Sequence, residues 1–248
     1  MISLKTTHEL EVMRQAGRIC AQAMQLAGQA VAPGITTGKL DKIVHDYIFS
    51  QDAVPSFLGL YGFPGSACIS VNEELIHGIP GKRVLHEGDI VSLDMGACYK
   101  GYHSDMTMTF PVGRISEETA RLLEVTRESL NRGIAQAVPG NRISDISRAV
   151  QSYVEENGYA VVTEFVGHGV GASVHEDPEV PNYDTGRRGA RLLPGMVIAI
   201  EPMVNVTGAE VRQLSNGWTV VPKSGSLSAH FEHTVAITES GPVIMTRL

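Results

Sequence analysis

The chain has 248 residues, of which 43% are hydrophobic and 19% are charged, and its formal net charge is −7. This length and composition are typical of a globular protein with a substantial core. The negative charge argues against a general binder of nucleic acids or anionic membranes, because such proteins usually carry a basic face. Three cysteines without a CxxC pair favour a reducing compartment over a disulfide scaffold.

The first twenty residues lack the basic and apolar segments of a signal peptide. The longest apolar runs, such as MVIAI at 196–200, are too short to span a membrane. We therefore expect a cytoplasmic protein.

The predicted elements of the first part of the chain are two helices followed by strands. Apolar residues at spacings of three and four predict a helix over 7–31, with Thr7 in its N-terminal cap region, and a second helix around 40–48. Pro33-Gly34 ends the first helix. Short apolar or alternating runs then predict strands: SACISV at 66–71, DIVSLD at 89–94 and DMTMTF at 105–110.

The later part of the chain shows the same order of elements. Helical spacing covers 116–137 and 143–154, and Pro139-Gly140 separates the two helices. Further strands are predicted in three runs: MVIAIEPMV at 196–204, WTVVP at 218–222 and HTVAIT at 233–238.

The two parts match at a nearly constant offset, which predicts an ancient duplication. Pro33-Gly34 and Pro139-Gly140 lie 106 residues apart, and the same offset pairs Leu40 with Ile146, Val44 with Val150, Tyr47 with Tyr153 and Ile48 with Val154. An offset of 107 pairs Gly88 with Gly195 and Asp94 with Glu201. We expect one catalytic domain over 1–248, with halves of roughly 1–112 and 113–248 related by a pseudo-twofold axis.

Two aspartates lie in runs that predict buried strands. Asp94 closes DIVSLD and Asp105 opens DMTMTF. An unpaired buried carboxylate costs several kcal/mol, so such acids pair, bind metal or take up a proton. A hairpin tip at Tyr99-Lys100 would place the two acids directly opposite each other, whereas a tip at Lys100-Gly101 would leave them diagonal on one face. The repeat predicts that Asp94 and Glu201 end equivalent strands and point to a common centre.

Further candidate ligands lie downstream. FVGHGVG sets His168 among glycines, and AHFEHTVAIT places Glu232 in an alternating strand. Any one of these side chains could instead be an ordinary turn, loop or strand-end residue. Together, the repeat and the strand positions favour a metal site made of Asp94, Asp105, His168, Glu201 and Glu232.

Four carboxylates and one imidazole favour Mn, Co, Fe(II) or Zn over a structural zinc site. Four carboxylates exceed what a single divalent ion needs for charge balance. The set therefore indicates two ions about 3.5 Å apart, as in two-metal hydrolases, where a shared water becomes the nucleophile.

The chain resembles the bacterial type I methionine aminopeptidases in motifs that run in order over nearly its whole length. These are EVMRQAGRI, SACISVNEELIHGIP, GDIVSLDMG with YHSDMTMTF, GHGVG with VHEDP, IAIEPM, GWTVVP and HFEHTVAIT. The resemblance implies an α/β (α+β) pita-bread fold, with two pseudo-symmetric halves, an antiparallel sheet inside and helices outside. It also implies hydrolytic removal of the initiator methionine from nascent chains when the second residue is small.

The resemblance implies a role for each candidate ligand. Asp94 would chelate one divalent ion, and His168 and Glu201 would bind the other. Asp105 and Glu232 would bridge the two ions. Glu201 would also carry a proton from the attacking water to the leaving amine.

The resemblance also implies substrate contacts. His77 would lie near the scissile amide, and His175 would hydrogen-bond the carbonyl oxygen as negative charge develops there. A small apolar cleft would hold the methionine side chain, and its walls would be Phe57, Leu60, Phe63, Cys68 and Trp218. Phe57 departs from the family, in which this position often carries Cys, so the shape of the cleft is left open.

Two alternatives are a sister enzyme on the same fold and a protein of a different class. Xaa-Pro aminopeptidases and prolidases share this catalytic domain but carry a sizeable additional N-terminal domain, which is not expected here. A non-catalytic binding module on the same fold is disfavoured because all five ligand positions hold residues able to bind metal. The expected partners are nascent polypeptide N-termini, with the ribosome as a further candidate, and neither nucleic acid nor membrane. We expect a monomer.

Overall fold

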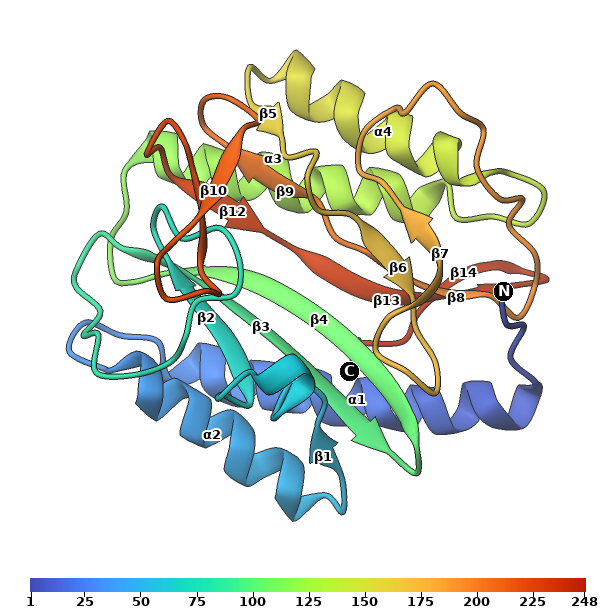
Figure 1. Cartoon of the computed structure of the whole chain (residues 1–248), viewed down its shortest axis with the longest axis horizontal. Coiled ribbons are helices and arrows are strands. Elements are labelled where there is room, and N and C mark those ends of the chain that lie inside the picture. The colour runs from blue at the N-terminus through green and yellow to red at the C-terminus, as the bar shows by residue number, and fades with distance from the viewer.

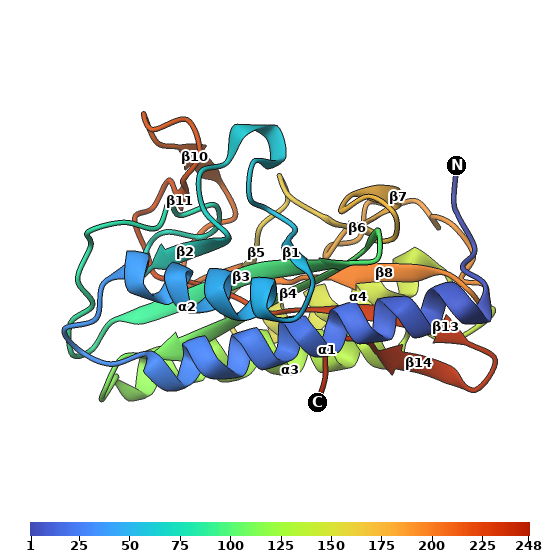
Figure 2. The same cartoon turned by 90° about the horizontal axis from the view of Figure 1, so that it is seen from below.

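Four helices pack against a curved antiparallel sheet in the computed structural model, which describes all residues, 1–248. Helices α1 and α2 lie along one side of the sheet's centre, and α3 and α4 lie along the other (Figure 1). The helices cover one face of the sheet, and the loops that carry β10 and β11 project from the other face (Figure 2). The helix bounds agree with the predicted positions: α1 Thr7–Ala30, α2 Thr37–Ser50, α3 Glu117–Ala135 and α4 Ile143–Glu156.

The first helix begins at Thr7, as predicted, but its cap lies one residue earlier than the sequence suggested. Thr6 rather than Thr7 caps α1, and its hydroxyl accepts from the Glu9 amide. The Glu9 carboxylate in turn accepts from the Thr6 amide at 2.7 Å, which completes a capping box. The cap fixes the point at which the chain enters the helix layer.

The main sheet has nine strands in the order β1-β3-β4-β13-β8-β6-β7, and β2 and β14 pair with β3 and β13. The strand bounds are β1 Val54–Pro55, β2 Ala67–Val71, β3 Ile90–Tyr99, β4 Tyr102–Pro111, β6 Gly167–Gly169, β7 Glu176–Val180, β8 Val197–Ile200, β13 Glu232–Thr238 and β14 Gly241–Ile244. The seam between the two halves is the contact of β4 with β13.

Two smaller sheets and one short helix complete the fold. Strands β5 Ala160–Val161, β9 Met203–Asn205 and β12 Ser228–His230 form one sheet, and β10 Val211–Gln213 pairs with β11 Val220–Pro222. A 3₁₀ turn, η1, covers Leu60–Gly62. No helix combines the length and the apolar composition needed to cross a membrane.

Two predicted strands differ from the structure. β3 continues to Tyr99, so Asp94 lies within this strand and does not end it. The run MVIAIEPMV is divided into β8 and β9, which belong to different sheets. Pro202 lies at the division and has no amide hydrogen to continue a ladder. Glu201 is therefore held at a break between strands.

The β3–β4 hairpin turns at Lys100-Gly101, which selects the diagonal arrangement of the two aspartates. Both turn residues have positive φ, 49° and 82°, as a tight two-residue hairpin requires. The register pairs Asp94 with Thr107, and Gly96 with Asp105. The two carboxylates therefore lie on the same face of neighbouring strands.

Matching positions of the proposed repeat have matching backbone geometry. Gly34 and Gly140 have φ of 93° and 94°, and Gly88 and Gly195 have φ of 92° and 91°. The amides of Gly34 and Gly140 donate to the carbonyls of Leu85 and Leu192 at 2.8 and 3.0 Å, a pair again 107 residues apart. These agreements support the duplication, which stays a prediction.

Each helix pair covers its own part of the sheet. The core under α1 and α2 includes Leu40, Val44 and Ile48 and reaches β2 and β3. The core under α3 and α4 includes Ile146 and Val154 and reaches β8 and β13. Burial of these apolar side chains, on the order of 1.5–3 kcal/mol for each large one, holds the strands in place beneath the site.

Candidate metal centre and active site

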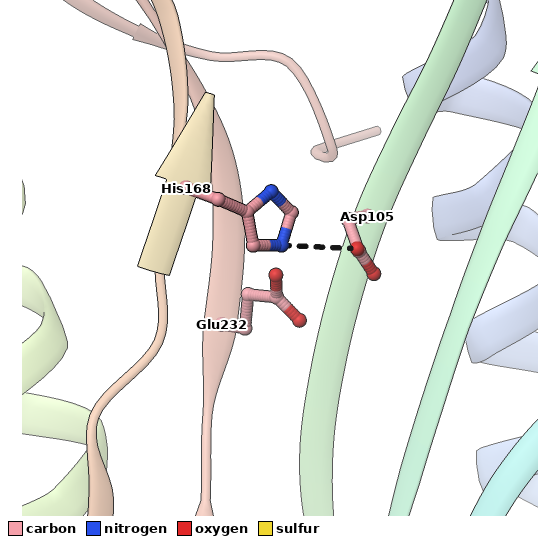
Figure 3. A group of neighbouring side chains, drawn as sticks. All are labelled: Asp105, His168 and Glu232. Atoms are coloured by element: carbon pink, nitrogen blue, oxygen red, sulfur yellow. Dashed lines mark ion pairs between the residues drawn. The ribbon is translucent and has the colours of Figure 1, made fainter. Parts of the chain in front are cut away.

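Three ligand candidates from three strands converge on one point. Asp105 lies on β4, His168 on β6 and Glu232 on β13, and one donor atom of each lies within 4.8 Å of the others. Figure 3 shows the imidazole and the two carboxylates turned toward one another. Asp105 and Glu232 come from opposite sides of the seam, so this group exists only when the halves are joined.

His168 is held by a close packing of backbones. A Cβ at Gly167 would lie 2.3 Å from the Ala199 carbonyl oxygen, and one at Gly169 would lie 2.2 Å from that of Asp177. Only glycine fits at such distances, so the GHG sequence is required where β6 runs between β7 and β8. His168 Nδ1 lies 2.9 Å from the Gly169 carbonyl oxygen. Because a carbonyl only accepts, Nδ1 carries the proton and Nε2 keeps its lone pair for a ligand.

The bridging candidates are fixed by threonines of the neighbouring strand. The Asp105 amide donates to Thr234 Oγ1 at 2.8 Å, and Thr234 Oγ1 donates back to the Asp105 carbonyl at 2.7 Å. Thr107 Oγ1 donates to Glu232 Oε2 at 2.8 Å. Each threonine thus ties β4 to β13 beside a carboxylate.

Asp94 and Glu201 extend the group on either side. Asp94 is the register partner of Thr107. Glu201 Oε1 lies 3.5 Å from His168 Nε2, and the Glu201 carbonyl accepts from Asn182 Nδ2 at 3.0 Å. All five ligand candidates line one cavity of about 630 Å³.

The carboxylates of the site resist ionisation in one another's presence. Burial raises the pKa of Asp94 to about 7. Burial also raises the pKa of Asp105, Glu201 and Glu232 well above their usual values, and so do the charges of neighbouring acids. Four buried carboxylates can be ionised together only when cations lie among them.

The site histidine is neutral at physiological pH. Burial, and then the neighbouring His175, lowers the pKa of His168 to about 4. Its Nε2 lies 3.7 Å from Asp105 Oδ2, which is too long for a hydrogen bond. We therefore interpret this pair as two ligands facing a common point and not as an ion pair.

The donor set fits divalent cations. Oδ1 of Asp94 and Oδ1 of Asp105 are buried without a hydrogen-bonding partner. Buried carboxylate oxygens are normally paired or bound to metal. Carboxylate oxygens and one neutral imidazole suit a catalytic transition-metal or zinc site. The chemistry of the residues therefore fits divalent cations, and the five-residue ligand set stays a prediction.

The two further histidines, His77 and His175, lie in the same cavity as the ligand candidates. The His175 ring is 4.4 Å from the His168 ring, centroid to centroid. The centroid of the His77 ring lies 6.0 Å from that of Phe165 and 6.5 Å from that of Trp218. His77 has φ of 58°, a strained value for a non-glycine residue that is often found at functional sites. Both histidines line the same cavity.

The apolar wall is contributed by the first half and Trp218. Phe57, Phe63 and Cys68 are buried together with Val174, and Leu60 and Trp218 pack against them. The rings of Phe63 and Trp218 meet edge to face at 5.1 Å. The five predicted pocket residues thus adjoin the acids in one cavity.

Comparison with known proteins gives one consistent result. The model of metallopeptidase family M24 matches residues 11–239. The chain belongs to this family. It is 54% identical over 248 residues to methionine aminopeptidase 1 of Bacillus subtilis and covers 100% of both chains. It is 42% identical, with a TM-score of 0.98 and full coverage of both chains, to a methionine aminopeptidase of Thermotoga maritima.

The M24 fold also includes longer proteins. A prolidase from Pyrococcus horikoshii matches with a TM-score of 0.81 and 26% identity, over 98% of this chain but 63% of the prolidase. The resemblance and the pita-bread fold predicted from the sequence are confirmed by these matches.

Nine residues that line the cavity were not predicted from the sequence. They are Tyr61, Ile76, Phe165, Val166, Gly167, Glu176, Asp177, Glu179 and His230. His230 is the most conspicuous, because its side chain is 3% exposed and lies 3.8 Å from Glu201. Its position two residues before Glu232 could have indicated it, since alternate residues of an extended segment share a face.

Proposed function

We propose that this chain is a metalloaminopeptidase that hydrolytically removes the N-terminal methionine from peptides and nascent proteins when the second residue is small. The observation that carries the proposal is the convergence of Asp105, His168 and Glu232 beside an apolar cleft. The curated relatives that match over the full length bear the name methionine aminopeptidase. The activity named for these relatives needs a metal site beside a pocket for the methionine side chain, and the convergent ligand candidates and the apolar cleft would provide both.

The metal requirement is two divalent ions per chain, drawn from Mn, Co, Fe(II) and Zn. Asp94 would hold one ion, His168 and Glu201 the other, and Asp105 and Glu232 both. Bound there, the ions would polarise the scissile carbonyl and lower the pKa of a shared water. Support comes from the buried, partnerless oxygens of Asp94 and Asp105 and from the mutual repulsion of the acids.

The substrate's first side chain would enter the cleft between Phe57, Phe63 and Trp218. A thioether is flexible and apolar and suits aromatic and sulfur-bearing walls. His77 borders this cleft through its contact with Trp218, so it would lie near the scissile amide. A crowded approach beside the ligands would exclude a bulky second residue.

Two side chains would handle charge and protons during turnover. Glu201 would accept a proton from the attacking water and deliver it to the leaving amine, which general acid–base catalysis requires. His175 would donate a hydrogen bond to the carbonyl oxygen as negative charge develops there. Burial lowers the pKa of His175, so it is neutral near pH 7 and offers one N–H.

The proposed partners are the N-termini of nascent chains, with the ribosome as a further candidate. The monomeric state and the cytoplasmic location expected from the sequence stay predictions.

The decisive experiment is a peptide assay on metal-stripped protein resupplied with Mn, Co, Fe(II) or Zn. We expect cleavage of Met-Ala-Ser, no cleavage of an Ala-Pro peptide, and loss of activity in Asp105→Ala and Glu232→Ala. Glu210→Ala, which removes an exposed carboxylate, is the matched control and should behave as wild type.

Three outcomes would contradict the proposal. Preference for the Ala-Pro peptide would favour a prolidase-like activity. Purified protein without divalent ions, together with active Asp105→Ala and Glu232→Ala variants, would overturn the two-metal mechanism. Metal binding without cleavage of any peptide would indicate a non-catalytic binding module.

A further inference from the structure

His230 is a buried histidine with no structural partner. The residue is 2% exposed, and neither Nδ1 nor Nε2 has a hydrogen-bonding partner in the protein. Leaving a buried polar atom unpaired costs about 1–3 kcal/mol of folding free energy. The folded protein would therefore be more stable with an apolar side chain at this position. Stability therefore does not explain the imidazole.

The neighbouring His233 shows what a satisfied histidine looks like in the same segment. His233 Nδ1 lies 2.9 Å from Thr246 Oγ1, on the side of β13 away from the cavity. His230 instead lines the cavity together with Glu201 and Glu232. The two histidines therefore differ in their hydrogen bonding and in the face they occupy.

The backbone of His230 is rigidly placed. Its amide donates to Thr109 Oγ1 at 3.0 Å, and Thr109 Oγ1 donates to its carbonyl at 2.8 Å. Because the Thr109 proton is used in that bond, Ser92 Oγ donates to Thr109 Oγ1 at 2.8 Å. Ser92 on β3 pairs with Thr109 on β4, two residues along each strand from the pair of Asp94 and Thr107. The backbone of His230 is thus held by the same strands that carry Asp94 and Asp105.

The His230 imidazole faces a proposed metal ligand in the cavity. His230 Nε2 lies 3.8 Å from Glu201 Oε2, while the other oxygen of Glu201 faces His168 at 3.5 Å. A separation of 3.8 Å is too long for a hydrogen bond, but such contacts often shorten when a site binds its metal or substrate. A neutral imidazole can offer Nε2–H as the donor.

We propose that His230 is a positioning residue that donates a hydrogen bond from Nε2–H to Glu201 Oε2. The bond leaves Oε1 directed to the metal beside His168 and fixes the carboxylate in the orientation required for proton transfer. The inference rests on the proposed function for its kinetic part only, since the orientation of Glu201 also affects metal binding. Hydrogen-bond partners of metal ligands typically contribute 10–100-fold to affinity or activity.

Three variants test this role. We expect His230→Leu to lower kcat for Met-Ala-Ser by about 10–100-fold and to weaken Mn²⁺ binding, measured calorimetrically on metal-stripped protein, about ten-fold. KM should stay within about two-fold, because the Glu201 contact acts on chemistry and not on uniform substrate binding. His230→Gln keeps an N–H donor and should restore both quantities to within about five-fold of wild type.

His233→Leu is the matched control. It removes the bond to Thr246, so its Tm should fall while kcat and Mn²⁺ affinity stay near wild type. The Tm of His230→Leu should be unchanged or raised, since this change removes two unpaired buried nitrogens.

The outcomes separate the inference from the proposed function. The role of His230 is overturned if His230→Leu keeps wild-type kcat and Mn²⁺ affinity, or if His230→Gln is as impaired as His230→Leu. A fall in the Tm of His230→Leu equal to that of His233→Leu would assign it a structural role instead. If the wild type cleaves no methionyl peptide, the proposed function fails, while the Mn²⁺ titrations still decide the question of His230.

Discussion

Helices α2 and α4 hold matching places in the order of elements of the two halves, yet the strands of the two halves contribute very different side chains to the cavity. The turns before these helices share glycine geometry, with φ of 93° at Gly34 and 94° at Gly140. On the cavity side, the first half supplies two aspartates from one hairpin and most of the apolar cleft. The second half supplies His168, Glu201 and Glu232 from three separate segments.

This difference indicates which positions the fold itself requires. Turn glycines and helix core positions determine where the strands lie, so under the predicted duplication we expect them to be alike in both halves. Side chains that face the cavity are freer to differ because the scaffold does not depend on them. Asp94 and Glu201 are the exception, since they match in the repeat and both line the cavity.

The largest expected effect concerns this matched pair of acids. Asp94→Ala and Glu201→Ala should each lower kcat at least about 100-fold, because loss of a ligand removes several kcal/mol of transition-state stabilisation. Glu201→Ala should lose more, since it also removes the proposed proton carrier. Steady-state kinetics with Met-Ala-Ser provides the measurement. Equal losses of kcat would contradict the additional role of Glu201 as a proton carrier. Wild-type kinetics for either variant would contradict the prediction that both acids are metal ligands.

The next effect tests whether protons and metal ions compete for the acids of the site. The folded pKa of Asp94 is about 7, against a usual value of 3.8. Its protonated form therefore stabilises metal-free protein fully below pH about 4, and this stability is lost as pH rises through 7.

Metal binding competes with those protons, so the gain in Tm on adding Mn²⁺ should increase between pH 5.5 and pH 8. At 100 times Kd the gain corresponds to about 2.7 kcal/mol. Thermal unfolding with and without Mn²⁺ checks this expectation, and Asp105→Ala should show little gain. A gain in Tm that does not change with pH would count against the interpretation.

A smaller effect concerns the turn glycines. Gly34→Ala and Gly140→Ala should each cost about 1–3 kcal/mol and match within about 0.5 kcal/mol, because no atom lies within 4 Å of either added Cβ. Gly81→Ala is the control, since Gly81 has equal space without a positive φ. Chemical denaturation measures the free energy of unfolding.

The second glycine pair should behave unequally. A Cβ at Gly195 would lie 3.0 Å from the Lys5 carbonyl oxygen, whereas the nearest atom to one at Gly88 is 3.9 Å away. Gly195→Ala should therefore be the more destabilising of the two. The reverse order would show that the backbone at the two turns is less alike than their φ values.

The smallest expected effect lies in the cleft, which belongs mainly to the first half. Phe57→Cys removes aromatic surface from the methionine pocket and should raise KM for Met-Ala-Ser several-fold, about 1 kcal/mol, with kcat little changed. Mn²⁺ affinity should be little affected because Phe57 offers no ligand atom. A large fall in kcat would mean that the cleft and the ligands are more tightly coupled than the structure indicates.

Much of the scaffold could be predicted from the sequence because it depends on local signals. Apolar spacing located all four helices, and Pro-Gly pairs located the turns between them. The hairpin register was left as two alternatives, although Gly101 favours the observed one, since a tight hairpin turn needs positive φ. The division of MVIAIEPMV at Pro202 was missed because the apolar run continues across it.

The rest of the site depends on contacts between distant segments. The place of His168 depends on the path of β6 between β7 and β8, where Gly167 and Gly169 closely approach the carbonyls of Ala199 and Asp177. His230 takes its place from Thr109, more than a hundred residues earlier in the chain. Spacing along the sequence carries no information on either contact. The roles of the site residues therefore follow from the resemblance to a known family, and the distances between their atoms follow from the structure.

The seam between β4 and β13 has a consequence for the order in which the protein itself is made. Glu232 and its partner Thr107 meet across this seam, and Glu232 follows all four helices in the chain. Chains fold from the N-terminus as they are synthesised, so the β3–β4 hairpin can form early with its two aspartates and no site. A protein proposed to act on chains still emerging from synthesis would thus acquire its own complete metal centre only after β13 has been made.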